Sequence, residues 1–91
     1  MTRARTIVES PSVQADVDAA RATYPRFDDG WDAWIWRISR GPDTAYAVPG
    51  FSNYYVFKSN SNFATYGVPL TKIVYEVVDT DTIRIVAVQV G

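Results

Sequence analysis

The fold is decided by residues 70–90, which read LTKIVYEVVDTDTIRIVAVQV. β-Branched and aromatic side chains fill two runs, Leu70–Val78 and Thr82–Val90, a composition typical of strands. Because only a short polar segment separates the two runs, the pattern predicts a β-hairpin. With that segment as the loop, Glu76 lies opposite Arg84, and opposite charges across a strand pair favour this register.

The two faces of the hairpin follow from the alternation of side chains along a strand. One face is apolar and is predicted to meet the core; it carries Ile73, Tyr75, Val77, Ile83 and Ile85. The other face is predicted to be open; it carries Lys72, Val74, Glu76, Arg84, Val86 and Val88. A shift of one residue would exchange the two faces and bury Arg84, so the register is strongly determined.

The sequence upstream of the hairpin predicts a strand and two helices. Residues 3–9 form a short, partly β-branched run that favours a strand. Ser10 is a candidate N-cap, followed by Pro11 at the first position of a helix that ends at Tyr24, before a proline. A second helix is predicted to end at Gly41. Each helix has one apolar face, made of Val13, Val17, Ala20 and Tyr24 in the first and of Phe27, Trp31, Trp34, Ile35 and Ile38 in the second.

A further strand is predicted over residues 54–58, where Tyr55 and Phe57 suit the core. The expected order of elements is therefore β-α-α-β-β-β, in a single domain spanning residues 1–91. This order predicts an α+β fold, in which the two helices of the N-terminal half pack on one face of an antiparallel sheet. The other face of the sheet is then open to solvent or to a partner.

Composition narrows the classes of function. The 91 residues include neither Cys nor His, which excludes disulfides, zinc sites built from these residues, and Ser-His-Asp or Cys-His catalytic arrangements. We expect no metal and no cofactor. The formal net charge of −1 argues against a protein that binds nucleic acid mainly through bulk positive charge. The N-terminal residues lead to no apolar stretch long enough for a signal peptide or a membrane span, so a cytoplasmic protein without a membrane partner is expected.

Three basic side chains are predicted on the open face: Lys58, Lys72 and Arg84. Basic groups gathered on a sheet can hold a phosphate backbone or stabilise the negative charge of a phosphoryl-transfer transition state. They are the candidate catalytic residues if the protein is an enzyme. The alternative is that they are ordinary solvated side chains on an exposed strand face.

Three aromatic residues are candidates for contact with a partner. Trp36 lies off the buried face of the second helix and is expected to pack against the loop 45–51. If it is displayed instead, it is a candidate anchor for a partner helix or for a second copy of the chain in a homodimer. Tyr54 is expected on the open face, and Tyr66 belongs to a long loop that could carry it there to stack on a base. A surface loop without such a role is the alternative for Tyr66.

The sequence also resembles a known family along essentially its whole length. Lys72–Asp79 (KIVYEVVD) and Thr82–Val88 (TIRIVAV) resemble the hairpin of RelE/ParE-family toxins from bacterial type II toxin–antitoxin modules. Ile7–Val17 (IVESPSVQADV) looks like the first strand and helix entry of that family. Val48–Gly50 (VPG), ahead of Tyr54–Lys58 (YYVFK), is similar to it as well, and the predicted order of elements is the order of the family.

The resemblance implies a growth-inhibiting toxin that a cognate antitoxin neutralises. RNA-cleaving members cut messenger RNA in the ribosomal A site; Lys72 occupies the position of a functional arginine, and Lys58 lies in a region that supplies lysines. Their last strand continues into a basic segment with the catalytic tyrosine, which this chain, ending at Gly91, does not match. Gyrase-inhibiting members lack the nuclease residues and act by binding a protein.

Three hypotheses therefore stay open. The preferred one is a toxin that binds a protein target such as DNA gyrase. The second is a ribosome-dependent mRNA endonuclease that uses Lys58, Lys72 and Arg84. The third is a protein of the family fold that retains no toxicity. Whether the chain is an enzyme depends on which of these holds.

Overall fold

The structure is a computed structural model that describes residues 4–60 and 67–91. Its elements, in chain order, are β1 (Thr6–Glu9), α1 (Pro11–Thr23), α2 (Phe27–Arg40), the 3₁₀ helix η1 (Pro42–Thr44), β2 (Tyr46–Ala47), β3 (Tyr54–Lys58), β4 (Thr71–Val77) and β5 (Thr82–Val90). The predicted α+β class and the order β-α-α-β-β-β are confirmed. Two short elements between α2 and β3, namely η1 and β2, are additions that the sequence pattern did not predict.

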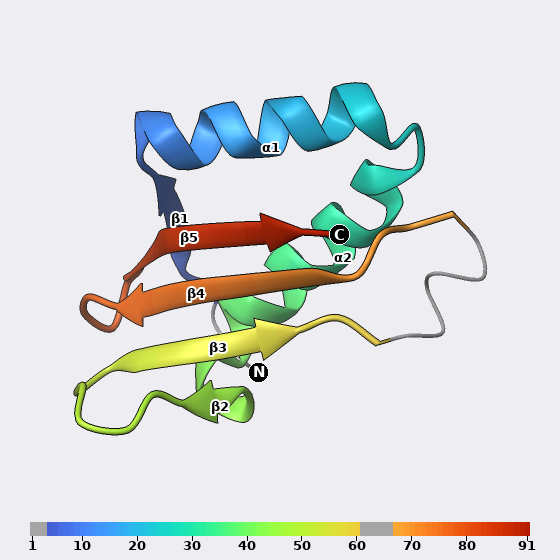
Figure 1. Cartoon of the computed structure of the whole chain (residues 1–91). Helices are drawn as coiled ribbons and strands as arrows, with labels where there is room; N and C mark the ends of the chain where they lie inside the picture. The colour runs from blue at the N-terminus through green and yellow to red at the C-terminus, as the bar shows by residue number, and fades with distance from the viewer. Residues whose placement is uncertain (1–3, 61–66) are drawn as a thin grey trace.

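The strands form one sheet in the order β1-β5-β4-β3-β2 (Figure 1). The sheet is mostly antiparallel, as predicted: β2 pairs with β3, β3 with β4, and β4 with β5 in that sense. β1 pairs with β5 in parallel, with Thr6 opposite Thr82. The first and last strands of the chain are therefore neighbours.

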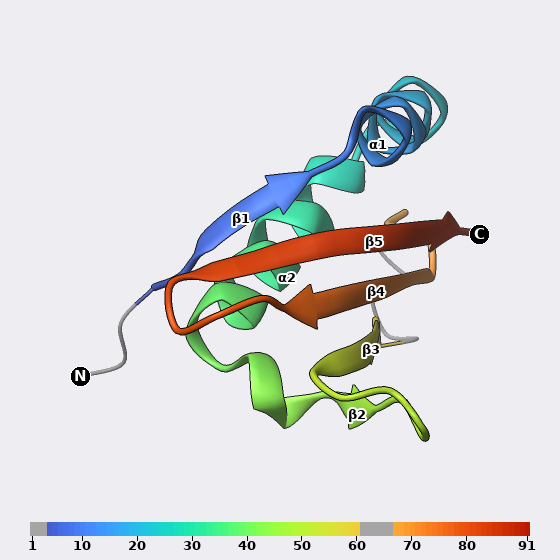
Figure 2. The same cartoon turned by 90° about the vertical axis from the view of Figure 1, so that its left-hand side faces the viewer.

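Both helices pack against the same side of the sheet. In Figures 1 and 2, α1 lies alongside β5 and α2 crosses behind the strands. The predicted N-cap is present, because the Val13 amide donates to the Ser10 hydroxyl at 3.3 Å, with Pro11 at the start of the helix. The buried apolar side chains of the helices are Val13, Val17 and Ala20 from α1 and Phe27, Trp31, Trp34 and Ile38 from α2.

The β4–β5 hairpin has the predicted register at its loop end. Glu76 pairs with Arg84, and the Val78 amide donates to the Thr82 carbonyl at 3.0 Å. The apolar face is buried as expected: Ile73, Tyr75, Ile83 and Ile85 have no exposed surface. The sheet therefore meets the helices through the side chains that the alternation of the sequence placed there.

A β-bulge interrupts the hairpin further from the loop. Tyr75 pairs with Ile85, whereas the next β4 residue, Val74, pairs with Ala87. Val86 is thus an extra residue on β5, and an extra residue reverses which face the following side chains point to.

The bulge corrects one part of the predicted face. Val88 was expected on the open face, but it pairs with Ile73 and packs against the core. Gln89, opposite Lys72, faces outward in its stretch of β5. Simple alternation fails here because it assumes a strand without insertions.

Candidate functional site

The side of the sheet away from the helices is the open face. Its side chains are Tyr54, Val56 and Lys58 from β3, Lys72, Val74 and Glu76 from β4, and Arg84, Ala87 and Gln89 from β5. None of these residues is fully buried. The candidate basic residues of the sequence therefore all reach the face on which they were predicted.

Two of the three basic residues lie directly opposite each other. Lys58 and Lys72 are cross-strand partners on β3 and β4. The adjacent pair is hydrogen-bonded, since the Ser59 amide donates to the Thr71 carbonyl at 2.9 Å. Lys58 and Lys72 consequently form a non-hydrogen-bonded pair, in which Cα atoms approach to about 4.5 Å and side chains lie close together. We call these two residues the lysine pair.

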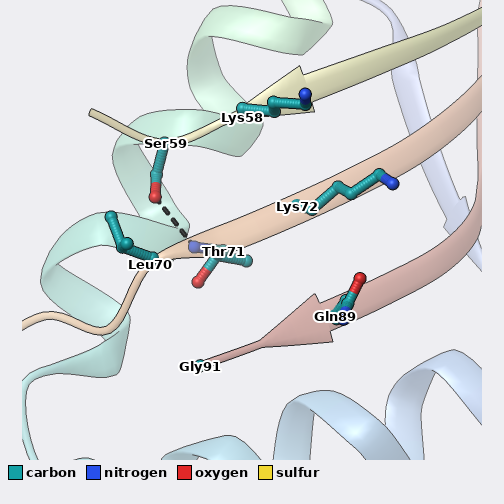
Figure 3. Close-up of a pocket in the computed structure, with 7 residues that line it drawn as sticks. All are labelled: Lys58, Ser59, Leu70, Thr71, Lys72, Gln89 and Gly91. Carbon is teal, nitrogen blue, oxygen red and sulfur yellow. Dashed lines mark hydrogen bonds between the residues drawn. The ribbon is translucent and has the colours of Figure 1, made fainter. Parts of the chain in front are cut away.

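The lysine pair adjoins a hollow of about 290 Å³. Figure 3 shows the two lysine side chains extending in the same direction, above strand ends that also carry Ser59, Thr71 and Gln89. Within residues 4–60 and 67–91, neither ammonium group has an ion-pair partner. Two unpaired cations next to hydroxyl and amide groups make this end of the open face suited to an anionic group.

The third basic residue is separate from this pair. Arg84 Nη2 donates to Glu76 Oε1 at 2.5 Å. Glu76 stands four residues from Lys72 along β4, a distance of about 13 Å at the rise of a β-strand. The open face thus has a positive end at the lysine pair and a neutralised ion pair at the other end, and the three cations do not form one cluster.

Trp36 is displayed on the surface of α2. Its side chain is 60% exposed, so the expectation that it packs against the loop 45–51 is wrong. The reason is local: the guanidinium group of Arg40, one turn further along the helix, lies 4.3 Å from the centre of the indole ring. A cation–π contact within the helix covers one side of the ring without help from the loop.

Of the two candidate tyrosines, one is placed by the structure. Tyr54 lies on the open face opposite Glu76, and its ring meets that of Phe51 edge-on at 5.9 Å between centroids. Phe51 is itself strongly exposed. Tyr66, and with it the middle of the loop 59–69, lies outside the described residues.

Three residues near the lysine pair were missed by the sequence reasoning. Tyr46 of β2 is 73% exposed and lines a second hollow together with Val56 and the lysine pair. A strand of two residues leaves too little pattern to find it. Gln89 was not considered, because its outward position follows from the bulge. Arg37 of α2 stands over the Phe57 ring, on the helix side of the same sheet edge.

Comparison of this chain with protein-family models, with curated proteins and with solved structures finds no match. Inside the described ranges, no group of three or more Asp and Glu side chains is placed to hold a metal ion. None of the helices in these ranges combines the length and hydrophobicity needed to cross a bilayer. What the face offers chemically is positive charge beside the exposed Tyr46 at one end, and the Phe51–Tyr54 aromatic pair beside the Glu76–Arg84 ion pair at the other.

Proposed function

We propose that the chain is the toxin of a bacterial type II toxin–antitoxin pair, and that it acts in the cytoplasm by binding a protein target such as DNA gyrase. A cognate antitoxin neutralises it. The proposal is supported by the order β-α-α-β-β-β, by the Glu76–Arg84 register of the hairpin, and by the resemblance of the hairpin and first-helix segments to RelE/ParE-family toxins.

One observation favours protein binding over RNA cleavage. The exposed ring of Tyr46 lines a hollow with the lysine pair, while the exposed Phe51 and the half-buried Tyr54 form a second aromatic group at the Glu76 end of the open face. Aromatic side chains displayed together with basic ones are the composition of protein-binding surfaces. Cleavage would also require a group that transfers a proton, and the residues around the lysine pair are Ser59, Thr71 and Gln89, whose side chains do not titrate near neutral pH.

The proposal is tested by controlled expression in a bacterium. We expect growth arrest, altered supercoiling of a reporter plasmid and intact transcripts. The K58Q/K72Q variant is expected to relieve the arrest because it removes the positive end of the open face. The matched control is R5Q/R21Q, which removes two positive charges away from the open face: Arg5 directly precedes β1, and Arg21 lies in α1. This variant should still arrest growth.

The outcomes separate the three hypotheses. Cuts at defined positions in messenger RNA would replace the protein-binding proposal with the endonuclease. Normal growth at high expression would contradict any toxin function. Equal relief by both charge variants would show that net charge, not the open face, matters.

A further inference from the structure

The outer edge of β3 is only half covered. β2 pairs with Val56 and Tyr55 but stops at Tyr46. The residue that would continue β2 opposite Lys58 is Thr44, which instead belongs to η1, with its amide donating to the Gly41 carbonyl at 3.2 Å. The C-terminal half of β3 therefore has no neighbour on this side among the described residues.

The backbone groups of Lys58 point toward this uncovered edge. In an antiparallel strand, the amide and carbonyl of one residue face one side, and those of the next residue face the other. The Ser59 amide donates toward β4, and the Tyr54 carbonyl accepts from Val48 on the β2 side. By alternation, Lys58 faces the β2 side, where no hydrogen bond to its backbone is formed by residues 4–60 or 67–91.

Hollows flank this edge on both faces of the sheet. On the open face, one is lined by Tyr46, Val56 and the lysine pair. At the edge itself and on the helix side, two more lie against Lys58 and share Arg37 and Phe57. An added strand would have room for alternate side chains in both directions.

The charged side chains described as lining these hollows are all basic. Lys58 and Lys72 reach one face, and Arg37, whose guanidinium group lies 5.7 Å from the centre of the Phe57 ring, reaches the other. Among the described residues, no carboxylate lines any of the three hollows. A segment placed here would meet positive charge above and below the sheet.

We propose that this edge binds an extended acidic segment of a protein partner, which adds to β3 in line with β2. The inference rests on the protein-binding function proposed above and gives that partner its chemistry. The backbone of the segment pairs with the amide and carbonyl of Lys58. Its acidic side chains alternately reach the lysine pair on the open face and Arg37 on the helix side.

The test uses the whole chain and a short fluorescent peptide of alternating Glu and Asp, followed by anisotropy at low ionic strength. K72Q and R37Q are each expected to weaken binding about threefold, the scale of one exposed charge pair. R5Q removes one positive charge next to β1, at the opposite edge of the sheet, and should bind the peptide as tightly as the parent does. In the unmodified protein, the peptide should slow hydrogen exchange of the Lys58 amide, because that amide becomes hydrogen-bonded.

Two control peptides isolate charge and strand pairing. A peptide of alternating Gln and Asn lacks the charge, and a Glu/Asp peptide that is N-methylated at every residue lacks the backbone donors. Both should bind much more weakly. If either control peptide bound as tightly as the Glu/Asp peptide, the proposal would be overturned. A hydrogen-exchange rate of the Lys58 amide that does not change when the Glu/Asp peptide binds would overturn it as well.

Two further outcomes separate this inference from its alternatives. Tighter binding of single-stranded RNA through the same lysine pair would assign the edge to nucleic acid and overturn the acidic-peptide proposal. Growth arrest without peptide binding would overturn the inference and leave the toxin proposal standing. Peptide binding without growth arrest would overturn the toxin proposal and leave the acidic-segment inference standing.

Discussion

Lys58 and Lys72 face each other across β3 and β4 as a pair of like charges in the closest type of antiparallel contact. Cross-strand like charges are destabilising, so the fold keeps this pair at a cost in stability. A position that carries a cost to folding and adjoins hollows on the open face is a reasonable place to look for function.

Replacing one lysine by an acid should stabilise the protein. K72E turns the repulsive pair into an attractive one and is expected to raise the free energy of unfolding by about 0.2–1 kcal/mol. Urea unfolding at low salt measures the gain, which should shrink as salt screens the charges. The control K72Q removes the repulsion only and should gain less. If the K72E protein were less stable than the K72Q protein, the expected attraction between Lys58 and the new carboxylate would be contradicted.

Gly30 of α2 should not tolerate a methyl group. A Cβ atom there would stand 2.6 and 2.7 Å from carbons of the Trp34 ring and 2.7 Å from Val68 Cγ1. Alanine favours helices over glycine by about 1 kcal/mol, yet overpacking a rigid ring typically costs about 1–3 kcal/mol. We expect G30A to lower the thermal midpoint. In a double-mutant cycle, V68A should offset part of that loss because it removes one of the clashing groups.

The hydroxyl of Tyr75 should contribute to stability through a buried hydrogen bond. It donates to the Pro42 carbonyl, and the Tyr75 side chain is fully buried between the sheet and η1. Y75F leaves that carbonyl without its partner and should cost about 1–3 kcal/mol in the free energy of unfolding. Y46F removes a hydroxyl from an exposed ring and should change stability by less than about 0.5 kcal/mol. Equal effects of the two substitutions would contradict the role of the buried bond.

The same residue predicts a loss of stability at alkaline pH. Burial raises the pKa of the Tyr75 phenol well above its ordinary value of 10.0. The unfolded state therefore loses the phenol proton first, and the free energy of unfolding should fall as pH rises beyond about 10. Unfolding curves on either side of that pH measure the fall. Y75F should show a shallower decline, and an identical pH dependence in both proteins would refute the assignment to Tyr75.

The sequence predicted the hairpin well because several local signals agree there. A short polar loop, alternating side chains and the Glu76–Arg84 pair all specify one register, and the structure has it from the loop as far as the bulge. The helices were predicted from the Ser10 cap and from apolar spacing, which act within a few residues. Of the candidate site, this local information placed Lys58, Lys72 and Arg84 on the correct face.

What the sequence did not predict depends on contacts between distant segments or on single insertions. The bulge at Val86 leaves no mark in the apolar pattern of β5, so Val88 was assigned to the wrong face and Gln89 was not recognised as part of the open face. β2 is a strand because its two residues pair with the edge of β3. Two residues are too few to show the alternation from which a strand is predicted. Trp36 stays exposed, with Arg40 of its own helix against one side of the ring, a contact that a search for a distant loop partner overlooks.

The parallel contact between β1 and β5 also bears on how the chain is made. Synthesis proceeds from β1 onward, so β1 has no strand to join until β5, nearly the whole chain later, has been translated. Until then the apolar sides of α1 and α2 lack the centre of the sheet that buries them, since Ile83 and Ile85 come from β5. Folding must therefore wait for a long-range closure late in translation, and until that closure the apolar side chains of both helices stay exposed to water.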